Sequence, residues 1–354
     1  MPIPIRNIYY LLAYAWDGLD QAGYVDVGSL DGHNAADLLA HILIGGATHV
    51  LKRGLDRSYV ESGEELSALR GRIDFGESLA RQSPARRKLS CVYEELSADI
   101  LHNQILKSSL ARLARVDELD GDLRQRLVSL RERYVGVREI PLSRALFRKL
   151  QLNKNNAHYS ILMRVCELVY DHALPDERGR GGQFVDFFQD ERMPLLFQRF
   201  VLNFYRRECP DLRVGGEVID WDAKADSDQD RALLPRMVTD ITLRSDDRTW
   251  VIDTKYYEEA LKGRFDAQKL ISSNLYQIFS YLKNLEKNGG QDAVAEGILL
   301  YPSVGAELRT GYSIQGHRVR VCTVNLDNDW KAIRGELLGL IRATAAAGSI
   351  QQLA

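Results

Sequence analysis

Two apolar segments joined by a short polar turn constrain this chain more than any other feature. They span residues 239–243 and 250–255, and the turn between them contains Ser-Asp-Asp-Arg. This pattern predicts two antiparallel β-strands, each carrying an acid, Asp240 and Asp253. Because side chains alternate across a strand, Asp253 and Lys255 share one face. If the hairpin closes at this turn, two carboxylates and one ammonium group converge on an apolar sheet.

These residue types suit metal-dependent hydrolysis of a phosphodiester bond. Mg²⁺ prefers oxygen ligands and is usually held by one or two carboxylates together with water and phosphate. A neighbouring lysine stabilises the charge that develops on the phosphate. An Asp-x-Lys triplet also arises by chance, since a second copy begins at Asp222 in a polar run. Asp253 differs because the apolar Val251 and Ile252 precede it, and charges that end apolar strands are harder to explain as surface residues.

A helix predicted after the hairpin supplies two further polar residues. Apolar side chains at spacings of three and four predict a helix over residues 274–282. Gln277 and Tyr281 are four residues apart and share one face of it. By themselves they are also typical of the polar border of an amphipathic helix. Following Asp240 and the Asp253-x-Lys255 pair, however, the set resembles the PD-(D/E)XK nuclease superfamily, which implies that both residues lie beside a metal site.

Length and composition exclude several classes of protein. The 354 residues exceed a usual single domain, and the net charge of −2 gives no overall attraction to nucleic acid. The four cysteines are far apart and are expected to be buried thiols, and the histidines form no metal-binding motif. There is no Walker A motif, no signal-peptide pattern and no apolar run near the roughly 20 residues that span a bilayer. We therefore expect a cytoplasmic protein.

The order of predicted elements indicates an α+β protein with three segments. We expect an N-terminal α/β partner-docking domain over residues 1–100, whose helices at 8–16 and 35–53 share one small core. A helical middle region and linker follow over residues 101–182. The segment 183–354 is predicted to hold a helix, three strands, a helix and a strand, which is the αβββαβ order of the PD-(D/E)XK core. The predicted elements are a helix at 194–207, strands near 212–221, 236–244 and 248–256, the helix around Gln277, strands near 295–301 and 317–324, and a last helix from about 328.

Three N-terminal motifs narrow the resemblance to one family. Residues 3–16 read Ile-Pro-Ile-Arg-Asn-Ile-Tyr-Tyr-Leu-Leu-Ala-Tyr-Ala-Trp, residues 69–75 read Leu-Arg-Gly-Arg-Ile-Asp-Phe, and residues 91–99 read Cys-Val-Tyr-Glu-Glu-Leu-Ser-Ala-Asp, followed by Asn103. Together they resemble McrC proteins over nearly the whole chain. The resemblance implies the nuclease subunit of a modification-dependent restriction system. It also implies a McrB-like AAA+ ring as partner, which binds GTP and recognises DNA with methylated cytosine, and whose GTP hydrolysis this chain stimulates.

The resemblance also assigns roles to particular residues. It implies that Asp240 and Asp253 bind Mg²⁺ or Mn²⁺, that Lys255 is the catalytic lysine, and that Gln277 and Tyr281 assist. Residues 196–201 resemble a Leu-Phe-Glu-x-Phe-Val motif of the relatives, but position 198 is a glutamine in this chain. The number of metal ions that the site would hold therefore stays open. Glu217 is an alternative extra acid.

The Arg-Gly-Arg-Ile-Asp motif has two interpretations. Arg70, Arg72 and Asp74 belong either to the surface that touches the partner ring or to a hairpin with an internal ion pair.

Two other functions remain open from the sequence. One is a regulatory subunit that stimulates the NTPase of its partner without cutting DNA itself, an idea that Gln198 supports. The other is a partner-independent nuclease of another defence or repair system. The intact set of Asp240, Asp253 and Lys255 favours cleavage, and the N-terminal motifs favour a partner.

Overall fold

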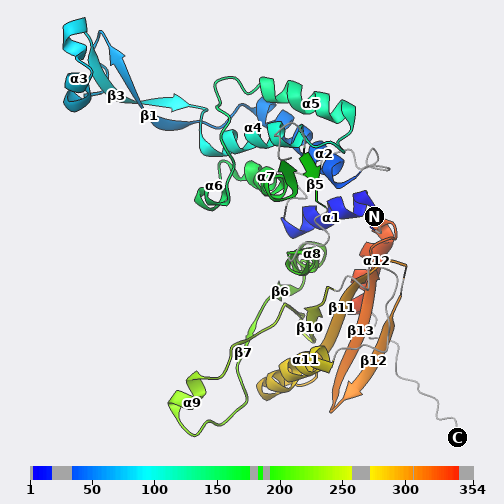
Figure 1. Cartoon of the computed structure of the whole chain (residues 1–354). Helices are drawn as coiled ribbons and strands as arrows, with labels where there is room; N and C mark the ends of the chain where they lie inside the picture. The colour runs from blue at the N-terminus through cyan, green and yellow to red at the C-terminus, as the bar shows by residue number, and fades with distance from the viewer. Residues whose placement is uncertain are drawn as a thin grey trace, which may run out of the picture. The chain divides into compact units, whose positions relative to one another are not determined.

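The structure of the chain, a computed structural model, contains two units (Figure 1). It describes residues 3–17, 34–175, 182–185, 192–256, 272–305 and 307–342. The middle unit comprises residues 23–25 and 34–186, and the C-terminal unit comprises residues 1–22, 26–33 and 187–354. Most of the predicted linker lies outside the described residues. Residues on both sides of position 100 belong to the middle unit, so the predicted functional division there stays a prediction.

The middle unit is a group of helices that carries a long β arm. Helices α2, α4, α5 and α7 pack through apolar faces that bury leucine and valine side chains, and the last three lie in the region 101–182 that was predicted to be helical. Asp120 caps α5 by accepting hydrogen bonds from two backbone N–H groups. The helices are α2 (Ala35–Arg53), α4 (Leu101–Leu113), α5 (Gly121–Glu132), α6 (Arg144–Lys149) and α7 (Ser160–His172), with a 3-10 helix η4 (Ala157–Tyr159) and a short β4–β5 pair (Ala173–Pro175, Gly182–Phe184).

The arm is an antiparallel hairpin that projects from these helices (Figure 1). Strand β1 (Ser58–Leu66) pairs with β3 (Leu89–Ser97), and the short β2 (Arg72–Ile73) lies on the other side of β3. Helix α3 (Phe75–Ala80) and the 3-10 helix η3 (Ser83–Arg86) form its tip. The Arg-Gly-Arg-Ile-Asp motif therefore enters β2, which pairs antiparallel with β3. Gly71 has φ +68°, and a Cβ atom there would lie 2.4 Å from the Val92 carbonyl oxygen, so the tight turn requires glycine.

A six-stranded mixed sheet forms the centre of the C-terminal unit. Its order is β12-β13-β11-β10-β9-β6, with β10, β11 and β13 mutually parallel and the other pairs antiparallel. The three parallel strands are almost fully buried, as expected for strands covered on both faces. The strands are β6 (Arg213–Gly215), β9 (Ile241–Arg244), β10 (Thr249–Thr254), β11 (Glu296–Ser303), β12 (Arg309–Ile314) and β13 (His317–Asn325).

Helices pack on this sheet through apolar side chains. Helix α11 (Ser272–Leu285) buries Ile278 and Leu282 in a core with Val251 and Leu299 of the sheet. The remaining helices are α1 (Ile5–Ala15), α8 (Met193–Glu208), α9 (Asp228–Ala232) and α12 (Trp330–Arg342), with the 3-10 helices η7 (Glu286–Asn288) and η8 (Gly290–Asp292). Among the described residues, no helix is both long and apolar enough to cross a membrane.

The placement of helix α1 corrects one expectation. We expected α1 and α2 to share a small core, but α1 belongs to the C-terminal unit and packs against α8. Aromatic rings fill this contact, since Tyr10 stacks on Trp330 with centroids 4.4 Å apart and Tyr14 meets Phe200 at 5.9 Å. The sequence shows that α1 is apolar, but it does not show which aromatic surface buries it.

In the C-terminal unit, two predicted strands are interrupted and one strand of the six-stranded sheet was missed. The segment predicted at 212–221 forms β6 and β7 (Val218–Ile219), and the segment at 236–244 forms β8 (Met237–Val238) and β9. Strand β12 was not predicted, because its alternating, mostly exposed residues at the sheet edge give a weak apolar signal. The prolonged loop between β7 and β8 carries α9 away from the sheet (Figure 1).

The position of α1 generates a stability prediction. Asn7 is 1% exposed and donates hydrogen bonds to the carbonyl oxygens of Leu326 and Asn328, at 2.8 and 2.7 Å. Asn7→Ala leaves two carbonyl groups unpaired and should lower the free energy of unfolding of the C-terminal unit by about 2 kcal/mol. All four tryptophans lie in that unit, so urea unfolding followed by tryptophan fluorescence reports on it.

The control for this prediction is Glu132→Ala, on an exposed position of α5 in the other unit. It should change the fluorescence transition by less than about 0.5 kcal/mol. An Asn7→Ala transition that matches the wild-type curve would show that α1 does not stabilise the C-terminal unit.

Candidate active site

The predicted hairpin brings Asp240 to the end of strand β10. Strands β9 and β10 pair antiparallel with Ile241 opposite Ile252, so Asp240 comes next to Asp253 in the same register. Asp240 Oδ2 accepts hydrogen bonds from the backbone N–H and the hydroxyl of Thr254, at 2.9 and 3.0 Å. Thr254, which the sequence interpretation did not single out, therefore ties the first acid to the strand that carries the second.

Asp253 is a fully buried carboxylate that forms an ion pair with Lys255. Its exposed fraction is 0%, and Oδ2 lies 2.8 Å from Nζ of Lys255. Oδ1 has no hydrogen-bond partner among the described residues. An unpaired buried carboxylate oxygen is costly, and in native proteins it calls for a specific explanation such as an ion.

Burial changes the protonation of this carboxyl group. Desolvation, reinforced by the nearby Asp240 carboxylate, raises the pKa of Asp253 to about 6, although the hydrogen bond and the charge of Lys255 oppose the rise. The Asp240 carboxylate lies close enough to raise this pKa further, so a cation beside the pair would stabilise the charged form of Asp253. A divalent cation would supply that stabilisation more completely than one lysine.

Gln277 and Tyr281 extend this group of polar contacts, as their spacing on one helix face predicts. Lys255 Nζ donates to Gln277 Oε1 at 2.9 Å, and Gln277 Nε2 donates to the Tyr281 hydroxyl at 2.8 Å. That hydroxyl in turn donates to the carbonyl oxygen of Val238 at 3.1 Å, two residues before Asp240. The contacts therefore run from one acid through α11 to the strand leading into the other. The structure brings all five predicted site residues together.

The two additional candidates for the metal site, Glu217 and Gln198, add no free carboxylate to it. Glu217 follows β6, and both of its carboxylate oxygens are bound by Arg244, so it is an ion-pair partner. Gln198 is half-buried on α8. Its neighbour Phe197 has its ring 6.4 Å from that of Tyr256, which directly follows Lys255.

The Arg-Gly-Arg-Ile-Asp motif lies on the arm, in the other unit. Arg70 places its guanidinium 3.8 Å above the Tyr93 ring, and Asp74 caps α3 by accepting a hydrogen bond from the Glu77 N–H at 2.9 Å. Arg72 is exposed on β2. Arg70 and Asp74 therefore make local stabilising contacts. The internal ion pair of the second interpretation is not among the ion pairs of the described residues.

The donor set fits a hard divalent cation such as Mg²⁺. Asp253 offers a buried oxygen without a partner, and Asp240 offers the oxygen that Thr254 does not use. Within the described ranges no group of three or more His, Cys, Asp or Glu side chains is arranged to hold a metal. Two carboxylates suffice for Mg²⁺ when water and phosphate oxygens complete its shell, whereas structural zinc requires four protein ligands.

The chain is thus an α+β protein whose C-terminal unit holds a buried carboxylate–lysine pair at the end of a sheet strand. The family described as McrBC 5-methylcytosine restriction system component matches residues 9–302 of this chain. The chain belongs to that family. The resemblance inferred from its N-terminal motifs is therefore confirmed at the level of the family.

The chain is similar to a curated protein and to a chain of a solved complex. The type IV methyl-directed restriction enzyme EcoKMcrBC of Escherichia coli strain K12 is 34% identical over 339 residues, which cover 96% of this chain and 97% of the relative. A chain in the refined half-complex from a tetradecameric assembly of Thermococcus gammatolerans McrB AAA+ hexamers with bound McrC matches with a TM-score of 0.58. At 18% identity, with 96% of this chain and 76% of that chain covered, this likeness shows the fold alone.

The raised pKa of Asp253 predicts a pH-dependent stability. The folded value of about 6 lies above the ordinary value of 3.8, so the folded state binds this proton more tightly. The contribution of this group to stability is therefore complete below about pH 4 and is lost as the pH rises towards 6. Asp253→Asn should then increase the free energy of unfolding at pH 8 by on the order of 2 kcal/mol, with a smaller increase at pH 5.

Urea unfolding in metal-free buffer at both pH values measures this effect. Asp222→Asn, at an exposed position of the second Asp-x-Lys triplet, is the control and should change neither value. An Asp253→Asn protein that is less stable than wild type at pH 8 contradicts the prediction.

Proposed function

We propose that this chain is the Mg²⁺-dependent DNA endonuclease subunit of a McrBC-like restriction system, with a site of the PD-(D/E)XK type. The single observation that carries the proposal is the buried Asp253 carboxylate, which has one unpartnered oxygen and lies beside Asp240 and Lys255. The order α8, β6–β7, β8–β9, β10, α11 and β11, with the short α9 inserted between β7 and β8, supports the expected αβββαβ arrangement.

Each residue has a defined role in this proposal. Asp240 and Asp253 hold the metal, which makes a bound water more acidic and offsets charge on the scissile phosphate. Lys255, with its side chain largely buried, neutralises the charge that develops on the phosphate as the bond breaks. Gln277 fixes the Lys255 ammonium group, and Tyr281 fixes Gln277. Because these hydrogen bonds already hold the lysine in place, little conformational entropy is lost when the reaction takes place.

The proposal includes a partner that selects the DNA. The T. gammatolerans McrC is bound to McrB AAA+ hexamers. We assign the same kind of partner, a McrB-like GTPase ring that recognises DNA with modified cytosine, to this chain. The exposed apolar tip of the arm supports this assignment, since Phe75 and Leu79 on α3 are 68% and 71% exposed. Such side chains clustered on a projecting element are typical of a protein-binding surface.

The cleavage proposal predicts the effect of removing the buried acid. Asp253→Ala should lower cleavage of methylated DNA at least about 100-fold, because the metal loses a ligand. The assay contains the purified partner, GTP and Mg²⁺, and gel electrophoresis measures the products. Stimulation of GTP hydrolysis should stay at the wild-type level.

The second Asp-x-Lys triplet offers a matched control. Asp222→Ala removes an acid from the same sequence context on an exposed loop and should leave cleavage unchanged. Equal cleavage by Asp253→Ala and wild type would refute the nuclease assignment. A wild-type protein that stimulates GTP hydrolysis but never cuts would instead support the regulatory alternative.

The partner proposal predicts an effect at the arm tip. Phe75→Asp places a charge in the apolar surface and should weaken binding to the partner at least about tenfold, measured by interferometry with the immobilised ring. Val135→Asp is the control, because Val135 is 82% exposed in the same unit but follows α5 and is not part of the arm. Unchanged binding of Phe75→Asp would exclude the tip as the docking surface.

A further inference from the structure

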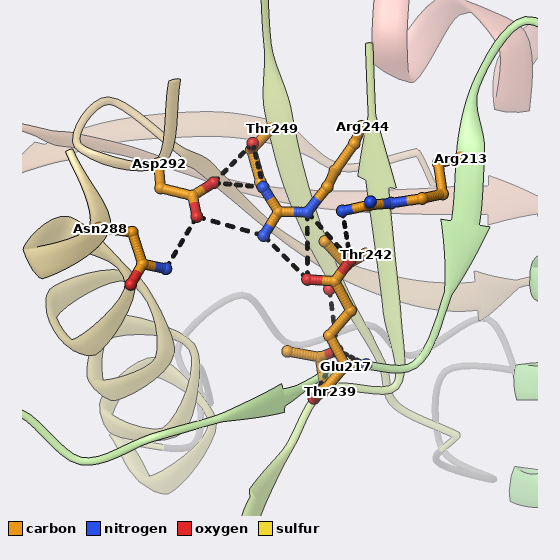
Figure 2. Close-up of polar contacts among 8 residues, drawn as sticks. All are labelled: Arg213, Glu217, Thr239, Thr242, Arg244, Thr249, Asn288 and Asp292. Carbon is orange, nitrogen blue, oxygen red and sulfur yellow. Dashed lines mark hydrogen bonds and ion pairs between the residues drawn. The ribbon is translucent and has the colours of Figure 1, made fainter. Parts of the chain in front are cut away.

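An ion cluster centred on Arg244 lies outside the carboxylate–lysine site. Arg244 is the last residue of β9 and only 12% of its side chain is exposed. Its guanidinium donates to Glu217 on one side, with Nη2 2.8 Å from Oε2, and to Asp292 on the other, with Nη1 2.5 Å from Oδ1 (Figure 2). Thr249 and Asn288 donate to Asp292 at 2.9 Å each. The cluster is thus a cation held between two acids that are themselves fixed.

The backbone of Glu217 binds the residue that precedes Asp240. The Thr239 N–H donates to the Glu217 carbonyl oxygen at 2.9 Å, and the Glu217 N–H donates to the Thr239 hydroxyl oxygen at 2.9 Å. That hydroxyl also lies 2.8 Å from the hydroxyl of Thr242 (Figure 2). Glu217 therefore joins the Arg244 cluster through its side chain and the Asp240 segment through its backbone.

These contacts surround an irregularity in the strand pairing. The β6–β9 ladder ends with Gly215 opposite Thr242, and the β7–β8 ladder ends with Val218 opposite Val238. Two residues, 216 and 217, therefore face three, 239 to 241. An extra residue of this kind bends a strand and redirects a side chain, and such bulges are over-represented beside active sites.

Gly216 shows how closely the two chains approach at this point. A Cβ atom on Gly216 would lie 3.0 Å from the Thr239 carbonyl oxygen and 3.6 Å from that of Asp240. Any larger residue would push the Asp240 segment away. The direction of the Asp240 side chain thus depends on the fit between residues 216–217 and 239–241.

The charges make this fit rigid. Hydrogen bonds between ionised groups are about twice as strong as neutral ones, and the fork of an arginine fixes a carboxylate in two directions. Asp292 also binds Arg244, but within the part of the chain that the structure describes it bonds to no backbone group of residues 239–241. Glu217 is the member that connects the cluster to Asp240.

We propose that Glu217 and Arg244 are positioning residues for Asp240, which aim its carboxylate and so set the affinity of the site for a divalent cation. The inference rests on the proposed function, since it assumes that Asp240 binds the metal. A purely structural role for the cluster would affect folding stability but not metal affinity.

Direct Mn²⁺ binding to the full-length protein tests the proposal. Glu217→Gln keeps the size of the side chain but removes the charge that Arg244 binds. The Mn²⁺ dissociation constant, measured by electron paramagnetic resonance, should rise about tenfold or more. The Mg²⁺ concentration for half-maximal DNA cleavage with the partner should rise by a similar factor.

Asp292→Asn is the matched control, because it removes the other acid from Arg244 and leaves Glu217 in place. It should lower the melting temperature while leaving the Mn²⁺ dissociation constant unchanged. If Glu217→Gln does not fold, Arg244→Lys, which keeps the charge but loses the fork, replaces it with the same expected rise. An unchanged dissociation constant in the folded variant overturns the proposal.

Asp253→Ala separates this inference from the proposed function. If that variant binds Mn²⁺ as tightly as wild type, the metal site itself is wrongly assigned. If it loses Mn²⁺ while Glu217→Gln retains wild-type affinity, only the positioning role fails.

Discussion

The candidate site of the C-terminal unit is organised around a carboxylate that is completely buried. Asp253 ends an apolar strand, so its charge is removed from water, and Lys255 alone offsets only part of that cost. A chain keeps so unfavourable a group where the group has a task that an apolar residue cannot perform. The surrounding contacts are arranged accordingly, since Thr254 holds Asp240 opposite and Gln277 holds the lysine.

Helix α11 and the Arg244 cluster hold the residues around this pair in place. Helix α11 lies on the buried face of the sheet and presents its polar edge to Lys255. Farther out, the Arg244 cluster fixes the bulge that leads into Asp240. The proposed cleavage needs such support, because a reactive side chain held only by its own backbone would not keep the geometry that the reaction requires. The support also explains why the strands around Asp240 are short and interrupted rather than regular.

Local patterns predicted much of this arrangement, and their failures share one cause. Helices α2, α8 and α11 and the β9–β10 hairpin follow from apolar periodicity and turn residues, and so does the pairing of Gln277 with Tyr281. The edge strand β12, the break before Asp240 and the partner of helix α1 were not predicted. Each depends on segments far apart in sequence: α1 is bound by residues beyond 320, and the break is held by Glu217.

By itself, the sequence determined the types of the main elements, the residues of the candidate site and the family to which the chain belongs. Periodicity and motif spacing are local properties, so one chain is enough to read them. Only the tertiary structure decided that Asp253 is buried without a full set of partners, that Glu217 forms an ion pair with Arg244, and that α1 belongs to the C-terminal unit. Burial and long-range pairing arise when segments far apart in sequence pack together and exclude water. A local sequence pattern does not predict which segments these are.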